Sequence, residues 1–368
     1  MKKGLLETYN INRLIIEDYF NSKLEIPIWI VEAACNINLN DIKIPTQYQY
    51  LWFCLHNTIL RRKQPSGKEF KTKVNFSSCY VKLDEKLEKK LDEACKVVDL
   101  PKYKFVSLCG YKKLNIYLKK IPLKVILKVC QILKLDIWEL IEDQDLFGKT
   151  NRNGKIKAPS NKRDVDLMVV LVWLRTEGHI ELGSTHIEIN QKNNIESLKT
   201  IKELLIRKFN LNDNLFFGVG KRGEDRLIIS SSPLRQLLCL KYGFPLGYKS
   251  GSLQPMDLRR LSKDEYKKIM AAFIQTEGCL SYQYTRNKKK KLPKFEFIVK
   301  DRYLANDCLF TLRKLGFKPY FSDKQNIFKV GLFNSQQVID LVHQTKKYFF
   351  DQRKIEYLKE VCTSGIGL

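Results

Sequence analysis

The sequence predicts an α+β protein in which two pseudo-symmetric αββαββα repeats follow a mainly helical N-terminal region. The triplet Thr176-Glu177-Gly178 recurs one hundred residues later as Thr276-Glu277-Gly278. Each copy ends an apolar segment of helical character and opens a segment of strand character, and the order of elements around both copies is the same. A break rich in Gly, Asn, Lys and Pro separates these repeats from the residues before them.

We expect residues 1–147 to be mainly helical and to contain a duplication, because Ile26-Pro27 recurs as Ile121-Pro122 with matching residues downstream. Residues 112–141 resemble the helix-turn-helix of phage repressors, in which a short basic helix precedes an Ile-Pro turn and an apolar helix. A helical packing module without nucleic-acid contacts is the alternative. Residues 148–163 are interpreted as a basic linker.

Repeat 1 is expected to span residues 164–260. Ser232-Pro233, an N-cap residue followed by proline at the first helical position, marks the start of its last helix. The other expected elements are a helix ending at Glu177, strand material over 179–190, a helix over 195–209 and a hairpin over 215–230.

Repeat 2 is expected to span residues 261–361. Its first helix begins with a capping-box pattern, in which Ser262 is followed three residues later by Glu265. The elements that follow are strands over 279–286 and 294–300, a helix over about 303–315, a hairpin over 317–333, a helix from Ser335 and a last helix over 348–361.

Charge indicates a polyanionic partner. The chain has 66 Lys and Arg against 40 Asp and Glu, a formal net charge of +26, and its pI is near 9.5. Nucleic acid is the commonest partner for such an excess, which is larger in residues 151–368 than in residues 1–150.

Cysteine and hydropathy patterns exclude other classes. The ten cysteines form no CxxC motif, and the four histidines are too scattered to complete a zinc site. We therefore expect a reduced, cytoplasmic protein. No signal peptide is expected at the start, and the longest uncharged apolar run, Leu167 to Leu174, is too short to span a bilayer.

The position of the two glutamates of the Thr-Glu-Gly triplets requires a physical explanation. A carboxylate buried at the end of a helix is costly unless it is paired or bound to a metal, and the helix dipole is already negative there. Two such sites in one fold favour a divalent-metal centre.

The helices that end in these triplets resemble those of the LAGLIDADG homing endonucleases. The matching segments are Val170–Gly178 and Met270–Gly278, with the acid eighth and the glycine ninth. The string Lys241–Ser250 is also similar to a stretch in archaeal and intein-borne members. The resemblance covers roughly residues 163–361 and implies a saddle of strands, with Glu177 and Glu277 as catalytic residues.

Through this resemblance, Glu177, Gly178, Glu277 and Gly278 are expected to form a site for Mg²⁺ or another divalent cation. Glycine would let the chain leave each helix in a conformation that other residues avoid. The sequence departs from the family pattern at two places. Leu171-Val172 replaces the small pair that repeat 2 has as Ala271-Ala272, and Arg175 and Gln275 occupy the sixth position, where the family often has Asp.

Basic residues of the hairpins are expected to contact phosphates. The nucleic-acid-binding candidates are Lys221, Arg222, Arg286, Lys288, Lys289, Lys290, Lys291 and Lys294. Arg226 and Lys329 are candidate basic residues of the catalytic pocket. Strand residues that could meet base edges are Glu188, Asn190, Tyr282, Tyr284 and Arg286, whereas His179 and His186 are expected to be strand surface residues.

We therefore expect a monomeric, metal-dependent, sequence-specific endonuclease that cuts both strands of double-stranded DNA. The alternative on the same fold is a non-cleaving DNA-binding regulator or a maturase-like RNA-splicing factor. The chain has neither the nucleophilic first residue nor the terminal His-Asn of a splicing intein, so a free-standing protein is expected.

Overall fold

The computed structural model describes residues 59–63, 69–73, 79–109, 120–148, 155–160, 163–180, 186–192, 194–211, 215–220, 223–242, 244, 256–284, 291–325, 327–351 and 356. The chain divides into two compact units. The first comprises Met1–Asn161, Glu181–Thr185 and Ser231–Gly243, and the second comprises Lys162–Ile180, His186–Ser230 and Phe244–Leu368.

The first unit mixes helices with two small antiparallel sheets. Its elements are β1 (Ile59–Lys63), β2 (Glu69–Lys73), β3 (Cys79–Lys82), α4 (Glu85–Val97), α5 (Lys102–Leu108), β4 (Lys120–Pro122), α6 (Leu123–Leu133), α7 (Ile137–Leu140), β5 (Asp145–Gly148), β6 (Lys155–Lys157) and α10 (Ser232–Tyr242). Strands β1 and β2 pair with each other, and the second sheet has the order β4-β3-β5-β6. These strands were not predicted.

The Ile-Pro motif of the first unit lies in a strand. Pro122 of β4 pairs with Tyr80 of β3, and α6 begins at the next residue. The preceding basic segment, like Ile26-Pro27, lies outside the described residues, so the helix-turn-helix and the duplication stay predictions. Helix α10 also contacts β3, β5 and β6, although it follows the strands of repeat 1 in the sequence.

The second unit contains two copies of the predicted αββαββ order, and the predicted last helix lies in this unit only for repeat 2, because α10 of repeat 1 belongs to the first unit. In repeat 1 these are α8 (Val165–Thr176), β7 (Gly178–Ile180), β8 (His186–Gln191), α9 (Ile195–Phe209), β9 (Leu215–Val219) and β10 (Asp225–Ser230). In repeat 2 they are α11 (Lys263–Gln275), β11 (Gly278–Tyr284), β12 (Lys291–Val299), α12 (Arg302–Lys314), β13 (Tyr320–Lys324), β14 (Ile327–Leu332) and α13 (Ser335–Thr345), followed by the 3-10 turn η3 (Lys346–Tyr348).

Strand pairing places the two repeats in register. The sheets have the orders β7-β8-β10-β9 and β11-β12-β14-β13, antiparallel throughout. Gly178 pairs with Ile189, and Gly278 pairs with Phe297. Ile189 and Phe297 are therefore equivalent, and every other position of the strands can be matched from these pairs.

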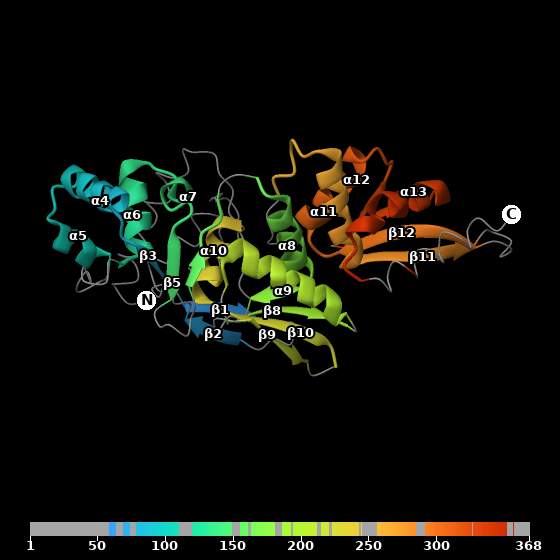
Figure 1. Ribbon diagram of the computed structural model, residues 1–368, viewed down its shortest axis with the longest axis horizontal. Helices are drawn as coiled ribbons and strands as arrows, with labels where there is room; N and C mark the ends of the chain where they lie inside the picture. The colour runs from blue at the N-terminus through green and yellow to red at the C-terminus, as the bar shows by residue number, and fades with distance from the viewer. Residues whose placement is uncertain are drawn as a thin grey trace. The chain divides into compact units, whose positions relative to one another are not determined.

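Each sheet has one face covered by helices. Buried side chains such as Ile187, Ile189 and Phe297 alternate with more polar ones, and Phe273 of α11 packs edge-on against Phe297 at 5.4 Å. Helix α9 contacts β8 and β10, while α12 and α13 contact β12 and β14 (Figure 1). The opposite side of each sheet is called its outer face below.

Helices α8 and α11 lie side by side and run in the same direction (Figure 1). Near their starts, Lys268 Nζ lies 4.0 Å from a carboxylate oxygen of Asp166. Near their ends, the Phe350 ring stacks on Trp173 at 6.1 Å, and the Phe350 N–H donates to Gln275 Oε1 at 2.5 Å. Because contacts link both ends in the same order, the two Glu-Gly pairs leave the helices at the same end.

The second half of each central helix is buried on all sides, which is typical of helices in the middle of a fold. Among their buried residues are Val169–Thr176 in α8 and Ile269–Gln275 in α11. Within the described residues, no helix combines the length and the apolar character needed to cross a bilayer.

Candidate active site

The threonine of each Thr-Glu-Gly triplet closes its helix in the same way. Thr176 Oγ1 donates to the carbonyl of Val172, four residues earlier, at 2.9 Å. Thr276 Oγ1 donates to the equivalent carbonyl of Ala272 at 3.0 Å. Such bonds to the preceding turn satisfy the hydroxyl inside the fold and often bend a helix. The repeat of the sequence is therefore a repeat of local structure.

The glycine of each triplet is required by space. A Cβ on Gly178 would overlap the Leu174 carbonyl, and one on Gly278 would lie 2.6 Å from the Cα of Ile274. Neither glycine has a φ in the left-handed region. The expectation of a special backbone conformation was therefore wrong, because each strand instead starts directly against the last turn of its helix.

The two glutamates are more accessible than expected. Glu177 is half-buried and Glu277 is exposed. Glu177 is the C-cap of α8; its N–H donates to the Trp173 carbonyl at 2.9 Å, and its own carbonyl accepts from the Asn190 N–H at 3.4 Å. The carboxylates therefore meet solvent at the helix ends, where a substrate could reach them.

Arg175, at the sixth position of its motif, fixes repeat 1 to repeat 2. Its guanidinium Nη1 lies 2.7 Å from the Asp307 carboxylate of α12, and both side chains are buried. Asp307 also accepts the Met256 N–H at 3.1 Å. Burial raises the pKa of the Asp307 carboxyl, and the Arg175 charge and the Met256 N–H act against that rise.

Gln275, the sixth residue of the other motif, also holds a distant part of the chain through its side chain. Its amide accepts the Phe350 N–H and donates to the carbonyl of Ala271 at 3.1 Å. The chain after η3 is thereby held against α11, with the Phe350 ring on Trp173 of repeat 1. Arg175 thus joins the repeats directly, whereas Gln275 joins them indirectly, by holding Phe350 of its own repeat against Trp173 of repeat 1.

Arg226 and Lys329 occupy equivalent positions on the outer faces. Arg226 pairs with Asn190, next to the Ile189–Leu227 pair, and Lys329 pairs with Ile298, next to the equivalent pair in repeat 2. Asn190 also contacts Glu177 through its N–H. Arg226 therefore lies two strands from Glu177, at a backbone separation of about 10 Å.

The remaining candidates are only partly placed. Lys294 lies on β12, its side chain half-buried. Lys291 and Tyr284 lie on strands, but only their backbones are described, and Tyr282 is half-buried on β11. Outside the described residues are Lys221, Arg222, Arg286, Lys288, Lys289 and Lys290. His179 is exposed on β7 and His186 is half-buried on β8.

Glu296, Phe216 and Tyr320 were missed. Glu296 is equivalent to Glu188, a strand residue that the sequence did single out, since each pairs with the second residue of its Gly-initiated strand. Phe216 and Tyr320 are equivalent on the edge strands, with exposed fractions of 46% and 47%. Strand register across the whole sheet is needed to see either match.

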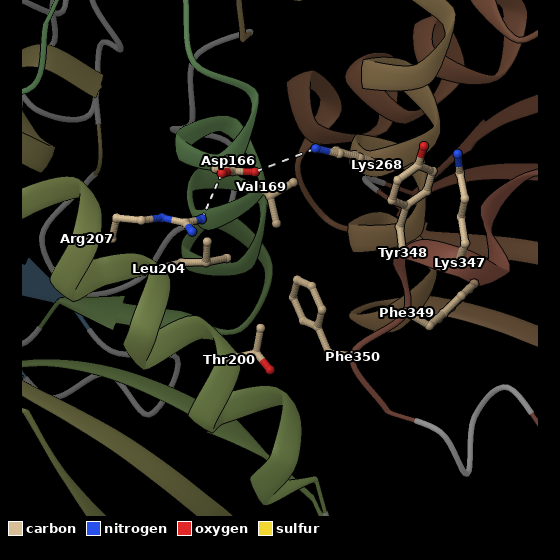
Figure 2. Close-up of a pocket in the computed structure, with 10 residues that line it drawn as sticks. All are labelled: Asp166, Val169, Thr200, Leu204, Arg207, Lys268, Lys347, Tyr348, Phe349 and Phe350. Atoms are coloured by element: carbon tan, nitrogen blue, oxygen red, sulfur yellow. Dashed lines mark hydrogen bonds and ion pairs between the residues drawn. The ribbon is translucent and has the colours of Figure 1, made fainter.

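A cavity of about 280 Å³ lies near the starts of α8 and α11, at the other end of the helix pair (Figure 2). Its charged residues are paired. Asp166 accepts from Arg207 at 2.8 Å and lies near Lys268, and Lys347 lies 3.1 Å from Asp264. With its cations held by carboxylates, this cavity is a weaker candidate than the Glu-Gly ends.

The residues present fit a loosely held divalent cation. Within the described part of the chain, no three His, Cys, Asp or Glu side chains are placed to hold a metal. Two carboxylates at one end of a helix pair suit Mg²⁺, which keeps several waters and binds through one or two carboxylates together with substrate phosphates.

Comparison with known proteins gives partial structural matches. No family model and no curated protein matches the chain. Full-length DUF199/WhiA from Thermatoga maritima aligns with a TM-score of 0.35 and 11% identity, over 57% of this chain and 63% of that one. This chain thus covers less than two thirds of that protein.

Two endonuclease structures are also similar to parts of the chain. The LAGLIDADG meganuclease I-AabMI bound to uncleaved DNA aligns with a TM-score of 0.39 and 13% identity, over 55% of this chain and 90% of that one. I-DmoI in complex with DNA and Mn aligns with a TM-score of 0.34 and 15% identity, over 49% and 96%. Likenesses this distant assign no function, which we derive from the chain's own geometry.

Proposed function

We propose that the second unit is a metal-dependent endonuclease that hydrolyses phosphodiester bonds in both strands of double-stranded DNA. The observation that carries this proposal is the paired placement of Glu177 and Glu277. Each follows a helix closed by the same threonine bond and precedes a glycine that admits no side chain. The helices run in the same direction, so both carboxylates emerge at one end of the unit.

In this proposal, the two carboxylates act on the two strands of the DNA duplex. Glu177 and Glu277 would hold Mg²⁺, which when bound neutralises phosphate charge and makes an attacking water more acidic. Hydrolysis joins the water oxygen to phosphorus, breaks one phosphorus–oxygen ester bond and leaves a proton for the departing oxygen. Arg226 and Lys329, at equivalent places on the outer faces, would bind the scissile phosphates through their positive charge.

Charge supports the partner. The net charge of +26 attracts any nucleic acid through its phosphates. The outer faces also carry side chains that could meet base edges, such as Asn190.

The test is a cleavage selection on randomised duplexes with Mg²⁺, followed by Glu177→Gln and Glu277→Gln on the selected site. Both variants should lose cleavage and keep their affinity for DNA, because glutamine keeps the shape and loses the charge that holds the cation. Glu196→Gln on α9, whose carboxylate pairs with Lys199 at 2.7 Å, is the matched control and should cleave normally. If both active-site variants cleave like wild type, the proposal is wrong.

A non-cleaving regulator or RNA-splicing factor is the second candidate. The net charge of +26 supports it as well, because attraction to a nucleic-acid backbone requires no bound metal. Salt-sensitive binding of duplex DNA or RNA, with no Mg²⁺-dependent product at any site in the selection, would establish this second candidate.

A further inference from the structure

Each outer face pairs a glutamate with the candidate basic residue of its repeat. Strand register makes Glu188 of β8 equivalent to Glu296 of β12, and Arg226 of β10 equivalent to Lys329 of β14. In each repeat the glutamate lies on the strand next to that of the basic residue. The two are offset by two residues along the strands and lie on the same face of the sheet. Two repeats with very different side chains have kept this one arrangement.

In repeat 2 the carboxylate lies between two ammonium groups. Lys294 Nζ is 2.6 Å from one oxygen of Glu296, and Lys329 forms an ion pair with the other. The Glu296 side chain is only 10% exposed. Burial alone would raise the pKa of Glu296, but hydrogen bonds from the two lysines outweigh it and lower that pKa, so the carboxylate is charged at neutral pH.

In repeat 1 the guanidinium lies between two carboxylates. Arg226 Nη1 is 3.4 Å from Glu188, and Nη2 is 2.6 Å from Glu224. Gly220 provides the room for this arrangement, because a Cβ there would overlap the Glu224 carboxylate and lie 2.4 Å from Arg226 Nε. The ion pair is therefore built into the hairpin.

These glutamates are unexpected on a surface that meets phosphates. A carboxylate there repels the DNA backbone and cancels one cation that would otherwise add to affinity. A largely buried ion pair has a compensating effect, since it restricts the long side chain of the basic residue to one position. The arrangement therefore fixes the position of the basic side chain at the expense of electrostatic attraction to DNA.

We propose that Glu188 and Glu296 are positioning residues that hold Arg226 and Lys329 at the scissile phosphates, lowering the affinity for DNA and raising the rate of cleavage. This proposal rests on the proposed function. It predicts opposite effects on two measured quantities when a glutamate loses its charge, which a merely structural role would not produce.

The experiment is Glu296→Gln in the full-length chain, with DNA affinity measured across a salt series and cleavage measured under single-turnover conditions with Mg²⁺. The slope of log K against log salt should become steeper by about 0.9, the value for one more uncompensated cation. The cleavage rate should fall about tenfold, the lower range for loss of a residue that orients a catalytic group. Glu296→Asp, which restores the charge, should recover the wild-type salt slope.

Two comparisons sharpen the test. Glu196→Gln removes the same charge from α9, away from the outer face, and should change neither quantity. Glu188→Gln should show the same two signs with smaller size, because Arg226 keeps Glu224 as a partner. Circular dichroism and the thermal midpoint of each variant would show that the fold is intact.

The proposal is overturned if Glu296→Gln weakens binding, leaves the salt slope unchanged, or cleaves as fast as wild type. Failure of the proposed function has a different signature, since wild type itself would then yield no product. In that case the part of the proposal that concerns rate falls too, and a steeper salt slope in Glu296→Gln would still establish the charge pairing.

Discussion

Repeat 1 and repeat 2 have the same order of strands and helices but different chemistry where they join. Repeat 1 contributes a charged tie, Arg175, whose partner is in repeat 2. Repeat 2 contributes the neutral Gln275, which holds the N–H of Phe350 in its own repeat, and the Phe350 ring then stacks on Trp173 of repeat 1. The last helix differs as well, because α13 contacts β12 and α11 whereas α10 contacts β3, β5 and β6. The two repeats thus share a backbone plan but differ in the side chains and helix contacts at their boundaries.

The active-site ends differ less than the boundaries do. Thr176 and Thr276 make the same hydrogen bond, and both glycines are excluded from carrying a side chain. Glu177 is half-buried and Glu277 is exposed. Features that would serve chemistry recur in both copies, whereas features that serve assembly occur once. The predictions below test that division.

The largest effect is expected from Arg175→Ala. This change leaves the buried Asp307 carboxylate without its cation and should lower the free energy of unfolding by about 3–5 kcal/mol at neutral pH. Urea denaturation would measure it. The loss should shrink in acid, where Asp307 takes up a proton. Arg207→Ala removes a guanidinium that is 61% exposed and should cost about 0–1 kcal/mol. Equal losses in the two variants would contradict the role given to Arg175.

A smaller effect is expected from Gly178→Ala and Gly278→Ala. The added methyl group must displace backbone atoms of the preceding helix, so each change should cost about 1–3 kcal/mol. Gly178→Ala should cost more, because its overlap with the Leu174 carbonyl is the tighter contact. Gly218→Ala is the control, since its methyl group would meet only the movable Ile228 side chain at 3.3 Å. A neutral Gly178→Ala would show that the close approach is not needed.

The sequence predicted what local patterns determine. The Ser262–Glu265 capping box is present, with both of its hydrogen bonds, and the doubled order of helices and strands is confirmed. Asp307 could not be predicted as the partner of Arg175, because the two residues are 132 positions apart and lie in different repeats. Glu296 was missed for a related reason, since its role depends on Lys329, which the neighbouring strand brings beside it, as well as on Lys294 of its own strand.

The smallest effect concerns pH and the repeat 2 outer face. The pKa of Glu296 is lowered in the folded protein from an ordinary value of 4.5, because two lysines hold its charged form. Their pairing therefore adds stability that is present above pH 4.5 and is lost as pH falls through the folded pKa. Glu296→Gln should be less stable than wild type at pH 7, with a difference that shrinks below pH 4.5. Urea denaturation of both proteins across this pH range would measure the difference in stability. A difference that grows in acid would contradict the pairing of Glu296 with two lysines, which distinguishes repeat 2 from repeat 1.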